Sequence, residues 1–154
     1  MKNDKRNIAE PPGIAGFVCN WVGYSGVEMA GINKIPYPAG VKLVRLTCMG
    51  RISLGLLLRA FELGADGVIM LGCPADMCNY NDGMHKAREV YQQANAMLAL
   101  LGIGEKRLSL VEVPAGDGEF VARELNAFSK LVASEKARIS RKADKQRRTV
   151  KETV

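Results

Sequence analysis

Short apolar runs that end beside a cysteine are the feature that most constrains this chain. Three of these runs are followed within two residues by a cysteine: residues 14–18 by Cys19, 41–46 by Cys48 and 66–71 by Cys73. A run that is apolar throughout, as 66–71 nearly is, is typical of a parallel strand that is covered on both faces. The fourth cysteine, Cys78, follows Cys73 by five positions on the same predicted loop. The sequence therefore predicts that all four cysteines lie at strand ends of one sheet.

Helical patterns alternate with these runs. The predicted strands cover residues 14–19, 41–46, 66–71 and 108–113. The predicted helices cover residues 26–32, 53–63 and 82–102, and a last one begins near 118. Serine is a favoured residue before a helix, and Ser25 and Ser53 are the predicted caps of the first two. Strands joined by helical crossovers form a parallel sheet. We expect an α/β fold, a single three-layer domain of about four parallel strands with helices on both faces.

The chain has 154 residues, which is the length of one ordinary domain. We expect a flexible lead-in over residues 1–12, an α/β domain over 13–134 and a basic, helical C-terminal tail over 135–154. The tail contains eight Lys or Arg residues and three acidic ones, and so carries five of the six net positive charges of the chain. The body is nearly neutral. The tail is interpreted as a solvated helix end or as a contact for an acidic partner or for nucleic acid.

Composition excludes several classes of protein. Aromatic residues make up only 6% of the chain, so a stacking platform for single-stranded nucleic acid is unlikely. No stretch approaches the roughly 20 apolar residues that span a bilayer. Residues 1–10 are polar and contain no apolar signal region, so we expect a cytoplasmic protein. Disulfides are disfavoured in that compartment.

Four cysteines at one sheet edge have several chemical interpretations. Ligands of open parallel sheets bind outside the carboxyl ends of the strands, where helix N-termini favour thiolates. The four thiolates are suited to a [2Fe–2S] cluster, a [4Fe–4S] cluster or a structural zinc ion. They are equally compatible with four buried, reduced core cysteines. A redox disulfide between Cys73 and Cys78 is a third alternative, although it lacks the common CxxC spacing. Spacing alone does not decide among these.

Few other residues suggest chemistry. His85 is the only histidine, lies one turn into a helix, and is expected to be solvent-exposed. No Ser-His-Asp or Cys-His arrangement is predicted, and no phosphate-binding glycine motif follows the first strand. Arg51 lies near Cys48, and Trp21 and Tyr24 lie near Cys19. Arg51 is expected to place positive charge near a reduced metal cluster, to contact a partner, or to form a salt bridge at a helix start. Trp21 and Tyr24 are expected to shield such a cluster from water, to contact a partner, or to serve packing.

Several motifs taken together resemble one known family. These are Gly-Phe-Val-Cys-Asn-Trp at 16–21, Cys-Met-Gly-Arg at 48–51, Gly-Ala-Asp-Gly-Val at 64–68, and Gly-Cys-x4-Cys-x-Tyr at 72–80. In this order, over roughly residues 13–130, they resemble the delta subunit of methyl-viologen-reducing hydrogenase. The family typically has a second cysteine in the first loop, at the position of Val22. Its second-loop histidines are replaced here by Pro74 and Asn79.

The resemblance implies a small, non-catalytic iron–sulfur subunit. It implies a [2Fe–2S] cluster held by Cys19, Cys48, Cys73 and Cys78, the four cysteines that remain. Such a subunit relays single electrons from a hydrogenase, or another donor enzyme, to the flavin-containing A-type subunit of a heterodisulfide reductase. The alternative is a structural or scaffolding subunit of such a complex, with zinc or no metal at the cysteines. No membrane contact is expected, and a nucleic-acid partner is unlikely.

Overall fold

A computed structural model describes residues 11–151, with side-chain surroundings given as far as residue 141 except at position 105. The strands are β1 (Ile14–Cys19), β2 (Val41–Leu46), β3 (Gly67–Gly72) and β4 (Leu108–Glu112). The α-helices are α1 (Val22–Ile32), α2 (Leu54–Glu62), α3 (Gly83–Leu100) and α4 (Gly118–Lys151). Three short 3-10 turns are η1 (Met49–Arg51), η2 (Ala75–Met77) and η3 (Glu105–Arg107).

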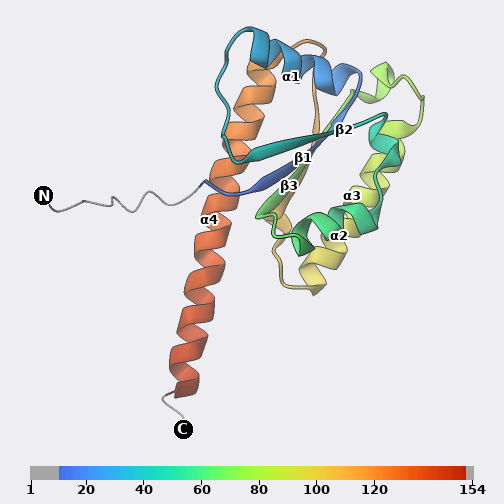
Figure 1. Cartoon of the computed structure of the whole chain (residues 1–154). Coiled ribbons are helices and arrows are strands. Elements are labelled where there is room, and N and C mark those ends of the chain that lie inside the picture. The colour runs from blue at the N-terminus through green and yellow to red at the C-terminus, as the bar shows by residue number, and fades with distance from the viewer. Residues whose placement is uncertain (1–10, 152–154) are drawn as a thin grey trace, which may run out of the picture.

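The four strands form one parallel sheet in the order β2-β1-β3-β4. Helices α1 and α4 pack on one face, and α2 and α3 pack on the other (Figure 1). Strand β3 is buried along its whole length, as its apolar run predicts, because it lies inside the sheet under helices on both faces. The predicted three-layer α/β fold is confirmed.

Alternation along the strands divides the core into two clusters. In β3, Val68 and Met70 face α2 and α3, whereas Ile69 and Leu71 face α1 and α4. Leu57 of α2 is fully buried in the first cluster. The predicted cap of this helix is confirmed, because the Ser53 hydroxyl accepts a hydrogen bond of 3.3 Å from the Leu56 N–H.

The predicted start of the first helix is wrong. Helix α1 begins at Val22, and Ser25 lies inside it, where its hydroxyl donates a 2.7 Å hydrogen bond to the Val22 carbonyl. The glycines of residues 20–26 suggest a turn, but Gly23 lies in the helix at its contact with β3. A Cβ there would lie 2.5 Å from the carbonyl oxygen of Leu71, so this glycine lets the helix approach β3 closely.

Two predicted inward stripes are only partly confirmed. In α3, Ala94 and Leu98 are buried, whereas Met97 and Leu101 are exposed. In α4, Leu125 and Phe128 are buried as predicted, but Leu131 is exposed and Val132 takes the inward position. The error in α4 is one helix position. In α3 the buried stripe is narrower than predicted, and Leu101 lies just after the helix ends. The width of a buried stripe depends on what packs against the helix.

Helix α4 continues without interruption past the predicted boundary at 134/135 and runs well beyond the sheet (Figure 1). The division into a domain and a basic tail stays a prediction, and the lead-in at residues 1–10 lies outside the described residues. Among the described residues, no helix combines the length and apolar character needed to cross a bilayer.

Candidate iron–sulfur site

All four cysteines lie at the carboxyl edge of the sheet, as predicted. Cys19 is the last residue of β1, Cys73 directly follows β3, Cys48 lies two residues after β2, and Cys78 follows η2. All four are buried and free of disulfides. From the neighbouring strands β1 and β3 the chain crosses to opposite sides of the sheet, to β2 and β4. This is the topological switch point where open α/β sheets bind their ligands.

The thiols lie in two pairs. The Sγ atoms of Cys19 and Cys73 are 3.3 Å apart. The Sγ atoms of Cys48 and Cys78 lie together beside Gly83, since a Cβ on this glycine would be 2.3 Å from the first and 3.0 Å from the second. The sequence-based alternative of a disulfide between Cys73 and Cys78 is not the pairing in the structure, since each of these cysteines is paired with a cysteine from a different strand end.

Backbone N–H groups point at three of the four sulfurs. The Trp21 N–H donates to Cys19 Sγ and the Gly50 N–H donates to Cys48 Sγ, each at 3.4 Å. The N–H groups of Tyr80, Met84 and Gly83 lie near Cys78 and lower the pKa of its thiol. The last two belong to the first turn of α3, so the positive end of the helix dipole lies at this sulfur. The edge is therefore built to stabilise negative charge on sulfur.

The thiols differ in their tendency to ionise. Burial alone would raise the pKa of Cys78, but the N–H donors of Tyr80, Met84 and Gly83 outweigh it and lower this pKa. Burial raises the pKa of Cys48, and the nearby Cys78 charge adds to the effect. Burial and the hydrogen bond with Cys19 raise the pKa of Cys73 to about 12. Of these three thiols, Cys78 is the one whose surroundings favour the thiolate, the form that binds metals.

Gly83 is a site residue that sequence reasoning missed. A Cβ at this position would lie 2.3 Å from Cys48 Sγ and 3.0 Å from Cys78 Sγ. Gly50 is held against it, because a Cβ on Gly50 would lie 2.7 Å from the Gly83 Cα. Only glycine leaves room here for the two sulfurs. The available signal was a glycine at the first position of a helix that faces the cysteine loops.

The four cysteines supply the donor atoms that an iron–sulfur cluster needs. Among the residues that the structure describes, no three His, Cys, Asp or Glu side chains form a site for a single metal ion. Four buried thiols, three of them beside backbone N–H groups, fit the ligand chemistry of such a cluster.

The remaining sequence candidates surround the site without entering it. His85 is exposed, as predicted, with 73% of its side chain accessible. It contacts Glu89, one turn along the helix. Trp21 is exposed beside Cys19, and Arg51 is exposed in η1. Tyr24 packs under the Arg45 guanidinium, which lies 4.3 Å from the ring centre. Trp21 and Arg51 are available to a partner, whereas Tyr24 serves local packing.

Comparison with known proteins identifies the family. The model of the methyl-viologen-reducing hydrogenase delta subunit family matches residues 14–134. The vhc iron-sulfur subunit of the F420-non-reducing hydrogenase of Methanococcus voltae is 38% identical over 108 residues, which cover 70% of this chain and 75% of that protein. The corresponding vhu iron-sulfur subunit of Methanocaldococcus jannaschii is 35% identical over 118 residues, which cover 77% of this chain and 88% of that protein.

A longer relative contains a similar segment. The A-type subunit of the ferredoxin/F420H2-dependent CoB-CoM heterodisulfide reductase of Methanosarcina acetivorans is 32% identical over 119 residues, 77% of this chain but only 15% of that protein. The family match covers all four strands of the sheet and all four cysteines. The chain therefore belongs to the methyl-viologen-reducing hydrogenase delta subunit family.

Proposed function

We propose that this chain is a non-catalytic electron-transfer subunit that holds a [2Fe–2S] cluster on Cys19, Cys48, Cys73 and Cys78. It relays single electrons from a hydrogenase, or another donor enzyme, to the flavin-containing subunit of a heterodisulfide reductase of the A type. The observation that carries the proposal is the arrangement of four buried thiols in two pairs at one sheet edge.

The pairs suit a two-iron cluster. A [2Fe–2S] cluster is held by four thiolates, two on each iron. In our proposal Cys19 and Cys73 bind one iron, and Cys48 and Cys78 bind the other. The cluster supplies the one-electron chemistry, which no side chain at this edge provides. The residues themselves hold the sulfurs, exclude water by burial and offer N–H donors to the added negative charge.

The names of the relatives support the partners that we propose, a hydrogenase and a heterodisulfide reductase. The archaeal hydrogenase relatives are named as iron–sulfur subunits, and the Methanosarcina acetivorans relative is named as a heterodisulfide reductase subunit of the A type. In that reductase protein, the segment similar to this chain is part of a longer polypeptide. A domain that is covalently joined to the reductase polypeptide in one protein is a natural partner of that polypeptide when it is encoded separately.

The test is the metal content of anaerobically purified protein, with an EPR spectrum after reduction. We expect about two irons and two sulfides per chain and a reduced S = 1/2 signal. Serine in place of any one of the four cysteines should remove most of the iron. Zinc, or a fold and partner binding that survive without metal, would contradict the proposal and support the structural, scaffolding alternative.

Val22→Cys is the control for this experiment. It restores a thiol at the position where the family typically has one, on a side chain that packs against the cysteine cluster. We expect no more iron than in the unchanged protein, since four ligands are already present. Iron bound only by the Val22→Cys variant would show that the natural chain has lost the site.

A further inference from the structure

One edge of the sheet lacks a covering helix. Parallel strands are normally covered on both faces, yet on the side of α2 and α3 no described helix lies over β2 (Figure 1). Val44, which points to this side from the middle of β2, is 46% exposed. The opposite face of β2 is covered, because Val41 and Leu43 pack into the cluster under α1 and α4.

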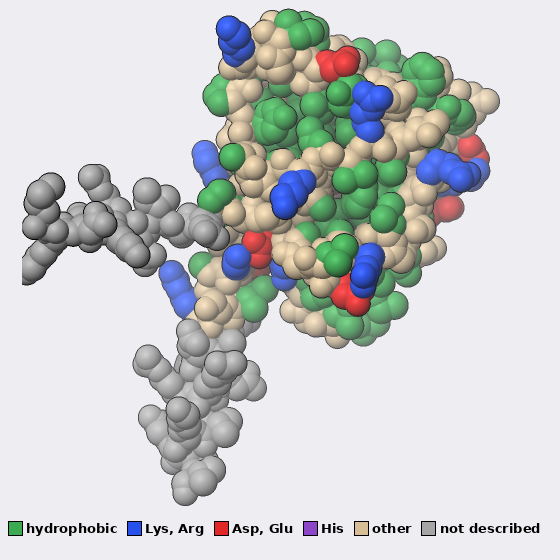
Figure 2. Space-filling model, viewed as in Figure 1, with side chains coloured by type: hydrophobic (Ala, Val, Ile, Leu, Met, Phe, Trp, Pro, Cys, Tyr) green, Lys and Arg blue, Asp and Glu red, His purple; other side chains and the backbone are tan. Residues whose placement is uncertain are grey.

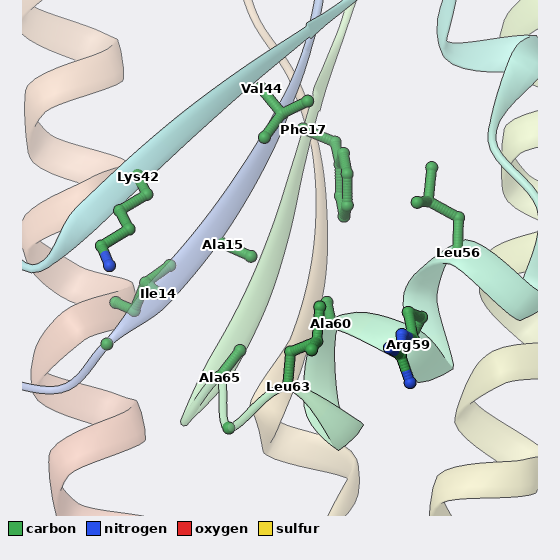
Figure 3. Close-up of a pocket in the computed structure, with 12 residues that line it drawn as sticks. Ile14, Ala15, Phe17, Lys42, Val44, Leu56, Arg59, Ala60, Leu63 and Ala65 are labelled. Carbon is green, nitrogen blue, oxygen red and sulfur yellow. The ribbon is translucent and has the colours of Figure 1, made fainter.

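The uncovered surface is an apolar groove of about 440 Å³ between β2 and α2. Figure 3 shows Lys42 and Val44 of β2 across the groove from Leu56 of α2 and from Leu63, which directly follows α2. Phe17 of β1 lies between Val44 and Leu56. Leu56 and Leu63 are exposed, Leu63 to 72%. The groove begins at the amino end of β1, so most of it is separate from the cysteine edge.

The charges at the rim of the groove are mainly positive. Lys42 and Arg59 line it, one from each side of the groove. Arg59 pairs with Glu62, but no carboxylate of the described residues lies within 4.0 Å of Lys42. Figure 2 shows hydrophobic side chains gathered on this face with Lys and Arg among and around them. A second copy of the chain would bring like charges together here, which disfavours self-association.

We infer that the groove is a docking site for a helix of the reductase partner, with an apolar stripe flanked by Asp or Glu. A helix seated between β2 and α2 continues the existing helical layer at ordinary packing distance. It covers Val44, Leu56 and Leu63, and its acids face Lys42. The inference deepens the proposed function, since it assigns the partner's contact to this groove and leaves electron transfer to the cysteine edge.

The apolar contact is tested with Val44→Asp, which places a charge in the groove. Leu100→Asp is the matched control, because Leu100 is 84% exposed at the end of α3 and outside the groove. Binding to the purified A-type reductase protein of the same organism is measured by calorimetry, and folding by thermal melting. We expect Kd to rise at least about tenfold for Val44→Asp and less than about twofold for Leu100→Asp. Equal effects, or no binding by the unchanged protein, would overturn the inference.

The charge contact is tested at Lys42. Zero-length carbodiimide coupling joins an amine to a neighbouring carboxylate, and we expect mass spectrometry to find Lys42 joined to an Asp or Glu in a helix of the reductase protein. Lys42→Arg should keep the affinity and lose this cross-link, whereas Lys42→Glu should weaken binding several-fold. A cross-link to a second copy, or a dimer in sedimentation that Val44→Asp dissociates, would identify the wrong occupant and overturn the inference.

Iron content separates this inference from the proposed function. If the protein carries iron but Val44→Asp leaves its affinity for the reductase unchanged, only the docking site is contradicted. A protein that binds through the groove but never holds iron contradicts the electron-transfer role alone.

Discussion

The buried side chains on the two faces of the sheet differ in chemical type. The face under α1 and α4 is aliphatic and aromatic, without a single sulfur among its buried residues. The face under α2 and α3 contains all four cysteines and three buried methionines. Met49 and Met84 are part of it, and their chain neighbours Gly50 and Gly83 approach the cysteine sulfurs.

This difference concerns function more than stability. The aliphatic face is closed by α4, which packs along α1 and against the sheet. The sulfur-rich face buries groups that do not add much to a core as side chains, because thiols that must ionise to bind metal are costly to bury. It also leaves β2 uncovered. We infer that both faces stabilise the fold and that only the sulfur-rich face is also shaped for a cluster and a partner.

The largest expected effects come from a matched pair, Leu125→Ala and Met84→Ala. Both side chains are fully buried, one on each face. Each truncation should cost about 2–5 kcal/mol of unfolding free energy, measured by denaturant titration. Only Met84→Ala should also lower the iron bound per folded chain, because its backbone N–H and side chain border the cysteine loops. Loss of iron in both variants would contradict a division of roles between the faces.

Gly83→Ala places a methyl group between the cysteine sulfurs of the sulfur-rich face. The added methyl group would meet Cys48 Sγ at 2.3 Å, so the sulfurs or the start of α3 must move. We expect a cost of about 1–3 kcal/mol, typical of overpacking, and a large loss of iron. Gly55→Ala is the control, since a Cβ there meets nothing within 4 Å in the same face's α2. Full iron occupancy in Gly83→Ala would show that the glycine is not required by the cluster.

Asp66→Asn tests how α4 is fixed to the sheet. Burial alone would raise the pKa of Asp66. Hydrogen bonds from Lys136 and from the Gly13 N–H outweigh burial, so the net shift of this pKa is downward. A lowered folded pKa means that this stabilisation is complete above the unfolded pKa and is lost as pH falls through the folded one. We expect the variant to lose about 1–2 kcal/mol at pH 7.

The pH profile is the measurement for Asp66. The difference in unfolding free energy between the natural chain and Asp66→Asn should shrink as pH falls below about 4, where the unfolded carboxylate becomes protonated. Iron content at pH 7 should not change, because Asp66 is at the amino end of the sheet. A difference that stays constant down to pH 2 would contradict a role for the carboxylate charge.

Ser53→Ala is the smallest expected effect. It removes the hydroxyl that accepts from the Leu56 N–H at the start of α2, beside the docking groove. We expect a loss of about 1 kcal/mol, typical of an exposed N-cap, measured by thermal melting. Ser53→Asp, which keeps an acceptor, should stay within a few tenths of a kcal/mol. Equal losses in both variants would show that the cap is unimportant.

Much of the fold was predictable because its strands are locally encoded. Strands β1 and β2 have their predicted bounds, and the shared cysteine edge follows from parallel strands that end together. The start of α1 was not predictable. Gly23 is a glycine because the carbonyl of Leu71, in a segment distant in sequence, leaves no room for a side chain. In the sequence alone this glycine suggests a turn.

The sequence by itself determined the four-stranded α/β fold, the cysteine edge and the family, because strand periodicity, helix caps and motifs are local patterns. Tertiary structure alone decided that Cys19 pairs with Cys73 and Cys48 with Cys78, and that Gly83 makes room between two sulfurs. It also decided that β2 is left uncovered. These features depend on which strands are neighbours and where helices cross them, and such distances are set by packing between segments far apart in the chain.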